Sequence, residues 1–111
     1  MHELESFGGK FDVVVLGMGE DGHVAGLFPH HPILQRQEKQ FFSFYDSPKP
    51  PSDRMTASMP LLTEAKLAVL LALGEAKRTA YERFNDAATT VEACPSISVK
   101  RCQEVLVVTD L

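Results

Sequence analysis

The sequence predicts an α/β fold built on a mostly parallel sheet. Residues 13–16 (VVVL) and 67–73 (LAVLLAL) are continuous apolar runs without polar alternation, which is typical of strands covered on both faces. Residues 104–109 (EVLVVT) form a third such run. Because a parallel sheet needs helices on both faces, we expect three layers. The chain supplies few helices for three strands, so we expect this fold to be incomplete here.

Composition and charge exclude several kinds of partner. The 111 residues suffice for one small α/β domain, over residues 1–111, with 44% hydrophobic residues. A formal net charge of −4 argues against nonspecific binding to nucleic acid or to an anionic membrane. No apolar run approaches a membrane span and no signal-peptide pattern is found, so we expect a cytoplasmic protein. Cys94 and Cys102 are expected to be free thiols, and no Cys, His and Asp spacing suggests a metal.

The first part of the chain surrounds a glycine-rich turn. Residues 1–10 are expected to be the end of a helix or a flexible lead into the first strand. Residues 17–22 (GMGEDG) follow that strand, and their glycines permit tight turns and close backbone approach. Residues 30–32 (HHP) begin a loop, in which either histidine is a candidate for the rim of a pocket.

The middle of the chain predicts a strand and a rigid connection. Residues 40–45 (QFFSFY) are strand-like, and the prolines of residues 46–51 (DSPKPP) enforce an extended conformation. Pro60 suits the first turn of a helix that begins near residue 59.

The last part predicts a helix and a loop before the final strand. In residues 75–86, Ala76, Ala80 and Phe84 recur every four residues and predict one buried helix face. Residues 87–100 are expected to form a loop or a short helix.

Three interpretations of the glycine turn compete. Its spacing satisfies G-x-G-x-x-G, a dinucleotide-binding pattern. However, Gly26 and Pro29 interrupt any following helix, and Glu20 and Asp21 would place two carboxylates beside a pyrophosphate. The second interpretation is a structural turn in which Asp21 caps a helix. In the third, His23 is a general base that Asp21 orients or tunes.

The stretch LGMGEDGHVAGLFP at residues 16–29 favours the third interpretation. It is similar to the signature LGxGxDGHxASLFP of the 6-phosphogluconolactonases, with Gly26 where serine is usual. The related glucosamine-6-phosphate deaminases share the turn but have a glutamate five residues after the histidine, where this chain has Phe28. The resemblance continues through residues 46–51 into an RxTxT-like pattern at residues 54–58. It therefore favours the lactonases.

The resemblance implies a Rossmann-like, three-layer fold of the sugar-phosphate isomerase/lactonase type. It implies hydrolysis of 6-phospho-D-glucono-1,5-lactone to 6-phosphogluconate in the pentose phosphate pathway, without a cofactor. His23 would activate water, since an imidazole with a pKa near ~6.5 accepts a proton at neutral pH. Asp21 would orient that imidazole. Gly17, Gly19 and Gly22 would let the backbone approach the substrate closely.

Basic residues beyond the turn are expected to bind the phosphate. Arg54 is the main candidate because its planar guanidinium matches phosphate oxygens, and Lys49 is expected at the rim. Thr56 and Ser58 are expected to serve strand packing. At the amino end of the last strand, Lys100 and Arg101 are expected to be surface charges facing away from the site.

Two rival functions remain. One is a sugar-phosphate isomerase or deaminase of the same fold, which Phe28 disfavours. The other is a noncatalytic fragment, because the resemblance covers the C-terminal half of the lactonases and no counterpart of their phosphate loop is found here. We therefore expect the chain to be a fragment that self-associates or pairs with the missing N-terminal half.

Overall fold

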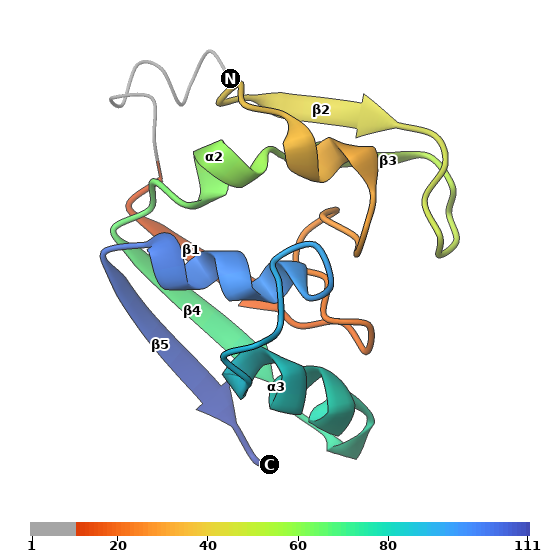
Figure 1. Ribbon diagram of the computed structural model, residues 1–111. Coiled ribbons are helices and arrows are strands. Elements are labelled where there is room, and N and C mark those ends of the chain that lie inside the picture. Colours follow the sequence, from red (N-terminus) through yellow and green to blue (C-terminus); the bar gives the residue numbers. More distant parts are fainter. Residues whose placement is uncertain (1–10) are drawn as a thin grey trace.

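The three apolar runs of the sequence form one parallel sheet. The computed structural model describes residues 11–111, so the expected lead at residues 1–10 lies outside the described residues. The sheet has the order β1-β4-β5, with β4 in the centre (Figure 1). Its strands are β1 (Val13–Gly17), β4 (Leu67–Ala72) and β5 (Glu104–Thr109). The strands predicted at residues 13–16, 67–73 and 104–109 are thus confirmed.

A two-stranded antiparallel ribbon lies beside this sheet. It consists of β2 (Phe41–Phe44) and β3 (Arg54–Ala57), with Phe41 opposite Ala57. The predicted strand at residues 40–45 is thus confirmed, and the proline-rich connection joins it to β3. The short helix α2 (Met59–Leu62) follows, with Pro60 in its first turn. Ser58 caps α2, because its Oγ accepts the N–H of Leu61 at 3.3 Å, so the expectation that it packs a strand was wrong.

The predicted helix at residues 75–86 divides into two parts. A 3₁₀ turn, η2 (Glu75–Lys77), precedes α3 (Arg78–Asn85). Ala80 and Phe84 are buried, as predicted, but Ala76 is exposed. It lies in η2, where three residues per turn break the four-residue spacing. Two further 3₁₀ helices are η1 (Pro32–Gln35) and η3 (Pro95–Arg101), and no helix within residues 11–111 is long and apolar enough to cross a bilayer.

One face of the sheet is packed against helices. The side chains of Val14, Ala68, Leu70 and Ala72 are at most 8% exposed and belong to the core. Helices η3 and α3 both lie on this side of the sheet in Figure 1. Because side chains of a strand alternate between faces, alternate residues of β1, β4 and β5 point away from this core.

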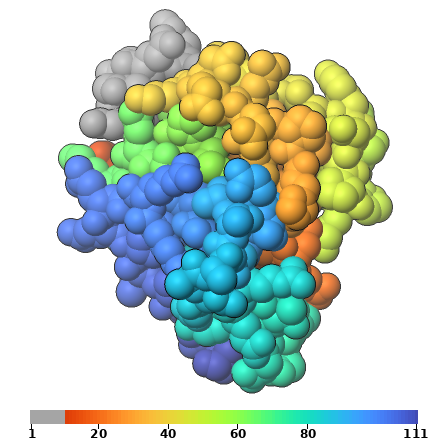
Figure 2. All heavy atoms as spheres, viewed as in Figure 1, coloured from red at the N-terminus to blue at the C-terminus, as the bar shows by residue number. Residues whose placement is uncertain are grey.

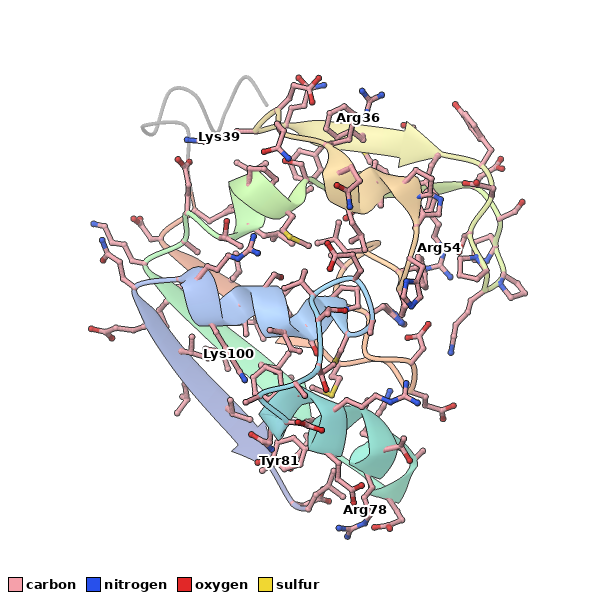
Figure 3. The ribbon with its side chains drawn as sticks, viewed as in Figure 1. Arg36, Lys39, Arg54, Arg78, Tyr81 and Lys100 are labelled. Atoms are coloured by element: carbon pink, nitrogen blue, oxygen red, sulfur yellow. The ribbon has the colours of Figure 1, made fainter. Side chains whose placement is uncertain are left out.

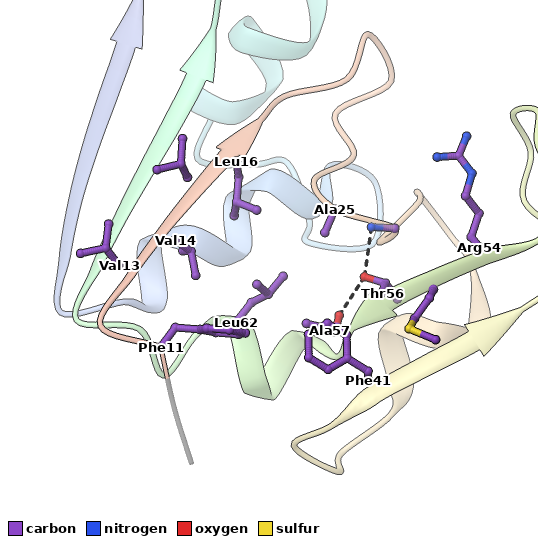
Figure 4. Close-up of a pocket in the computed structure, with 13 residues that line it drawn as sticks. Phe11, Val13, Val14, Leu16, Ala25, Phe41, Arg54, Thr56, Ala57 and Leu62 are labelled. Atoms are coloured by element: carbon purple, nitrogen blue, oxygen red, sulfur yellow. Dashed lines mark hydrogen bonds between the residues drawn. The ribbon is translucent and has the colours of Figure 1, made fainter. Parts of the chain in front are cut away.

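The other face is open within residues 11–111. Val13, Val15, Leu106 and Val108 are 53%, 63%, 53% and 39% exposed, which agrees with the expectation that the chain supplies too few helices to cover this sheet. Figure 4 shows Val13 on the opposite side of β1 from Val14. The register aligns Val15 with Val69 and Leu106, which makes the exposed side chains contiguous. We call the following residues the open sheet face: Val13, Val15, Leu67, Val69, Leu71, Leu106 and Val108.

Candidate active site

The glycine turn leaves the carboxyl end of β1 and is anchored to the neighbouring strand. The N–H of Met18 donates to the carbonyl of Leu71 at 2.9 Å, and the N–H of Ser96 donates to the carbonyl of Gly22 at 2.9 Å. No helix follows Gly22 until η1 begins at Pro32. The dinucleotide and helix-capping interpretations both need a helix here, so the structure supports neither.

Asp21 and His23 form a hydrogen-bonded pair on this turn. His23 Nδ1 lies 2.5 Å from Asp21 Oδ1, and the backbone N–H of His23 donates to the same oxygen at 3.1 Å. An ionised carboxylate only accepts, so this contact favours the tautomer with its hydrogen on Nδ1. Nε2 then holds a lone pair, and among residues 11–111 it has no hydrogen-bond partner. The side chain of His23 is 20% exposed and that of Asp21 is 29% exposed, so water reaches both.

The pKa of Asp21 is lowered by its surroundings. Partial burial by itself raises this pKa, because it disfavours the charged carboxylate. The hydrogen bonds from the side chain and backbone of His23 outweigh burial, with smaller contributions from the charges of His23 and Lys49. Asp21 is therefore ionised at neutral pH.

The glycines of the turn differ in their surroundings. A Cβ on Gly19 would lie 2.1 Å from the Cε1 and Nδ1 atoms of His23, so the imidazole occupies the space of a side chain. Gly22 has a φ of +89°, and a Cβ there would lie 2.7 Å from the Sγ atom of Cys94. A Cβ on Gly17 would meet nothing within 4 Å. Glycine is thus required at positions 19 and 22 because a side chain there would overlap His23 or Cys94. Substrate binding by Gly17, Gly19 and Gly22 stays a prediction.

The ring of Phe28 connects the turn to Arg54. It is fully buried, and its centroid lies 4.5 Å from that of the His23 ring. The guanidinium of Arg54, at the start of β3, lies 5.5 Å from the same centroid. One aromatic side chain therefore contacts both the candidate base and the candidate phosphate ligand.

Part of the Arg54 guanidinium is hydrogen-bonded to the proline-rich loop that precedes β3. Its Nε donates to the carbonyl of Pro51 at 3.0 Å, and its Nη2 donates to the carbonyls of Pro50 and Lys49 at 2.9 and 3.4 Å. Among the described residues Nη1 has no such acceptor. Figure 3 shows Arg54 beside the proline-rich loop and Lys100 far from it. Lys100 instead donates to the carbonyl of Phe84 at 2.6 Å, at the end of α3.

Thr56 has a role that the sequence did not indicate. Its Oγ1 accepts the N–H of Gly26 at 3.0 Å and donates to the carbonyl of Ala57 at 2.9 Å (Figure 4). This buried hydroxyl fastens the segment after His23 to β3. A Cβ on Gly26 would lie 2.7 Å from the Cβ of Thr56, so a serine at this position would require a shift.

A cavity of about 420 Å³ lies between β1 and the ribbon (Figure 4). It is lined largely by apolar side chains of both elements, and Arg54 is the one charged residue among them. Asp21 and His23 do not line it. We place the chemistry at the pair, because apolar walls alone supply no base. In residues 11–111, no three His, Cys, Asp or Glu side chains are grouped to hold a metal ion.

Nearly the whole chain matches a known protein family. The family model described as glucosamine-6-phosphate isomerases/6-phosphogluconolactonase matches residues 2–108. The human 6-phosphogluconolactonase is 45% identical over 74 residues, which are 67% of this chain and 29% of the relative. The chloroplastic 6-phosphogluconolactonase 3 of Arabidopsis thaliana is 40% identical over 82% of this chain and 28% of its own length. The chain thus spans less than a third of these relatives.

Solved structures share the fold. The 6-phosphogluconolactonase from Leishmania guyanensis superposes with a TM-score of 0.74 at 28% identity, over 90% of this chain and 39% of its own. The one from Thermotoga maritima gives a TM-score of 0.80 at 23% identity, over 97% and 47%. The second likeness concerns the fold alone. Together they confirm the predicted α/β fold with its mostly parallel sheet.

Proposed function

Because the chain belongs to the glucosamine-6-phosphate isomerase/6-phosphogluconolactonase family, we propose that this protein hydrolyses 6-phospho-D-glucono-1,5-lactone to 6-phosphogluconate in the pentose phosphate pathway. The observation that supports it most is the Asp21–His23 pair, whose geometry leaves Nε2 of the imidazole as a proton acceptor. Arg54 contacts the same Phe28 ring as His23 and is the candidate ligand for the phosphate.

In this proposal His23 and Asp21 act as a base and its orienting partner. Nε2 takes a proton from water, and the oxygen attacks the lactone carbonyl to give a tetrahedral oxyanion. Asp21 holds the ring and stabilises the imidazolium that forms. As the oxyanion collapses, the bond to the ring oxygen breaks and the imidazolium returns its proton to that oxygen. The products are a carboxylic acid, which ionises, and a hydroxyl group.

Arg54 and Lys49 bind the phosphate in this proposal. The free Nη1 of Arg54 donates to a phosphate oxygen, while the carbonyls that hold Nε and Nη2 fix the direction of the guanidinium. The positive charge of Lys49, which helps to lower the pKa of Asp21, adds to the attraction for the phosphate. The exposed edge of the glycine turn at Gly17 is open to a ligand.

Phe28 argues against the deaminase alternative. It occupies the position of the deaminase glutamate, and its fully buried ring packs on His23. A phenyl ring neither gives nor accepts a proton, so the site lacks the second acid–base group that ring opening of an amino sugar would use.

The direct test measures two reactions of the full-length natural protein. We expect rapid hydrolysis of the lactone, corrected for its spontaneous opening, and no release of ammonia from glucosamine 6-phosphate. Ammonia release at a rate comparable with lactone hydrolysis would contradict the assignment as a lactonase. Absence of both reactions would favour the noncatalytic alternative, in which the chain only binds sugar phosphates.

We further propose that the open sheet face packs against another polypeptide, either a second copy or the remainder of a longer protein. Seven contiguous apolar side chains form this face, and such patches are rare on monomers. The free edge of β1, beside the apolar cavity, offers a second contact surface.

The mass in solution of the 111-residue chain tests this pairing. We expect it to self-associate on size exclusion with light scattering, and Val15→Lys should reduce the association by placing a charge on the open sheet face. Tyr45→Lys, which alters a side chain that is 72% exposed and lies outside both surfaces, is the matched control. A well-behaved monomer with cooperative unfolding would contradict the proposal.

A further inference from the structure

His31 is fixed by two hydrogen bonds from opposite sides of its ring. Its Nδ1 accepts the N–H of Ile33 at 3.0 Å, which caps η1. A ring nitrogen that accepts a backbone N–H has no hydrogen of its own, so in the neutral ring the hydrogen lies on Nε2. Nε2 is 2.7 Å from Oδ1 of Asp46 and donates to it. The same histidine therefore caps a helix and binds the loop after β2.

The ring has a defined place beside the candidate site. Its side chain is 11% exposed, whereas that of Asp46 is 74% exposed. The His31 ring packs 4.7 Å from the ring of Phe44, which in turn packs edge-on against Phe28 at 6.3 Å. Phe28 contacts both His23 and Arg54. Contacts through two aromatic rings thus connect His31 to the site.

The loop that Asp46 begins is a closed unit. Ser47 Oγ donates to the carbonyl of Lys49 at 2.8 Å and accepts its N–H at 3.2 Å, and the N–H of Ser47 donates to Ser52 at 3.1 Å. Arg54 binds three carbonyls of the same loop. Because these internal hydrogen bonds hold the loop together, the loop moves as a whole. Its position then depends on its contacts with other segments, such as that between Asp46 and His31. Figure 2 shows the yellow-green loop projecting beside the orange segment that contains His31.

We propose that His31 is a positioning residue that holds this loop, through Asp46, where Lys49 and Arg54 meet the phosphate of the substrate. The inference rests on the proposed function for its ligand, a sugar phosphate. His31 does not touch the reacting atoms. It sets the affinity for the phosphate, because releasing Asp46 lets the loop move, together with Lys49 and the carbonyls that orient the guanidinium of Arg54.

The kinetic test uses the full-length natural protein and four variants. Asp46→Ala removes the acceptor, whereas His31→Asn keeps the cap of η1 but lacks the distant nitrogen. Each should raise KM for the lactone about threefold to tenfold, as expected for one hydrogen bond, with kcat within about twofold. The double variant should be no worse than either single variant, because both remove one contact. Asp46→Asn retains the acceptor and should restore KM.

Asp53→Ala is the matched control. It removes the same charge from the same loop, at an exposed residue without a histidine partner, and should leave KM within about twofold. Equal KM values for Asp46→Ala and Asp53→Ala would overturn the positioning role, because charge alone would then explain the effect. If the KM increases of the two single variants multiply in the double variant, the positioning role is overturned as well.

A second measurement separates this inference from the proposed function. Amide hydrogen exchange of Ser47 and Lys49 in the free protein should be faster in Asp46→Ala and His31→Asn than in Asp53→Ala. If the wild-type protein opens no lactone but exchange changes as expected, the function fails and the loop attachment stands. Unchanged exchange would overturn the attachment whatever the activity.

Discussion

The glycine turn (residues 17–23) and the proline-rich loop (residues 46–53) hold their functional groups in different ways. In the turn, the bonded partners Asp21 and His23 are two residues apart, and backbone hydrogen bonds tie the turn to β4 and η3. In the loop, the attachment through Asp46 and His31 joins residues fifteen apart. The proposed base is thus placed by local chain geometry, and the loop that carries the proposed phosphate ligand Lys49 by contacts between segments. We expect changes in the turn to lower kcat and changes in the loop to raise KM.

The largest effect is expected for His23→Ala in the full-length protein. Loss of the base should lower kcat by roughly 10²–10⁴-fold with KM little changed. The acid limb of the kcat/KM profile against pH should also disappear. Rates must be corrected for spontaneous lactone opening. Near-full activity with the wild-type pH profile would mean that another group, such as Asp21, is the base.

Gly19→Ala should give the next largest effect. Its methyl group would overlap the His23 ring, so the ring must move, and a displaced base lowers kcat by about 10²-fold. Gly17→Ala provides the comparison, because its methyl meets no protein atom within 4 Å. A loss of lactone affinity in Gly17→Ala would indicate substrate contact at that point. If Gly19→Ala keeps the wild-type kcat, the turn tolerates movement and the contrast with the loop is lost.

Arg54→Ala should act mainly on KM. Losing a charged hydrogen bond to phosphate raises KM about tenfold or more, and kcat falls less, to the extent that the phosphate positions the lactone. Arg54→Lys keeps the charge but not the fork, so the loop carbonyls lose their donors and recovery should be incomplete. Steady-state kinetics on the lactone measures both constants. A fall in kcat with unchanged KM would contradict a binding role.

The smallest effect concerns stability at acid pH. The pKa of Asp21 lies below its ordinary value of 3.8, so the ionised carboxylate stabilises the fold above that pH. This contribution is lost as pH falls through the lowered pKa of the folded state. Asp21→Asn should therefore have a lower Tm than wild type at pH 7, and the difference should shrink below pH 3.8. A constant difference, or the same pattern in Asp53→Asn, would contradict this.

The sequence was enough to predict those features that depend on residues close together in the chain. Three apolar runs predicted the strands of the sheet. Asp21 was expected to orient or tune His23, and the structure contains a hydrogen bond between them. A buried strand followed by glycines also predicted the place of the turn. In each case, residues adjacent in the chain decide the outcome, because backbone geometry restricts where neighbours can lie.

The sequence did not suffice where distant segments meet. Neither Ser58 as a helix cap nor Thr56 as a partner of Gly26 has a pattern of its own. His31 was predicted only as a loop residue at a pocket rim, and its partner is fifteen residues away. The shortage of helices predicted that the sheet would be incompletely covered, but an apolar run does not reveal which of its faces stays open, so the exposure of Val15 could not be predicted.

The parallel register also sets the order in which the site is completed during synthesis. Val13 pairs with Leu67, and the N–H of Met18 binds the carbonyl of Leu71, so the turn lacks these partners until that later strand has left the ribosome. The bond from Ser96 to Gly22 comes later still. Pairings so distant in sequence form slowly, because the intervening chain must first be closed into a loop. Until then, the apolar residues of β1 remain available to chaperones and to other nascent chains.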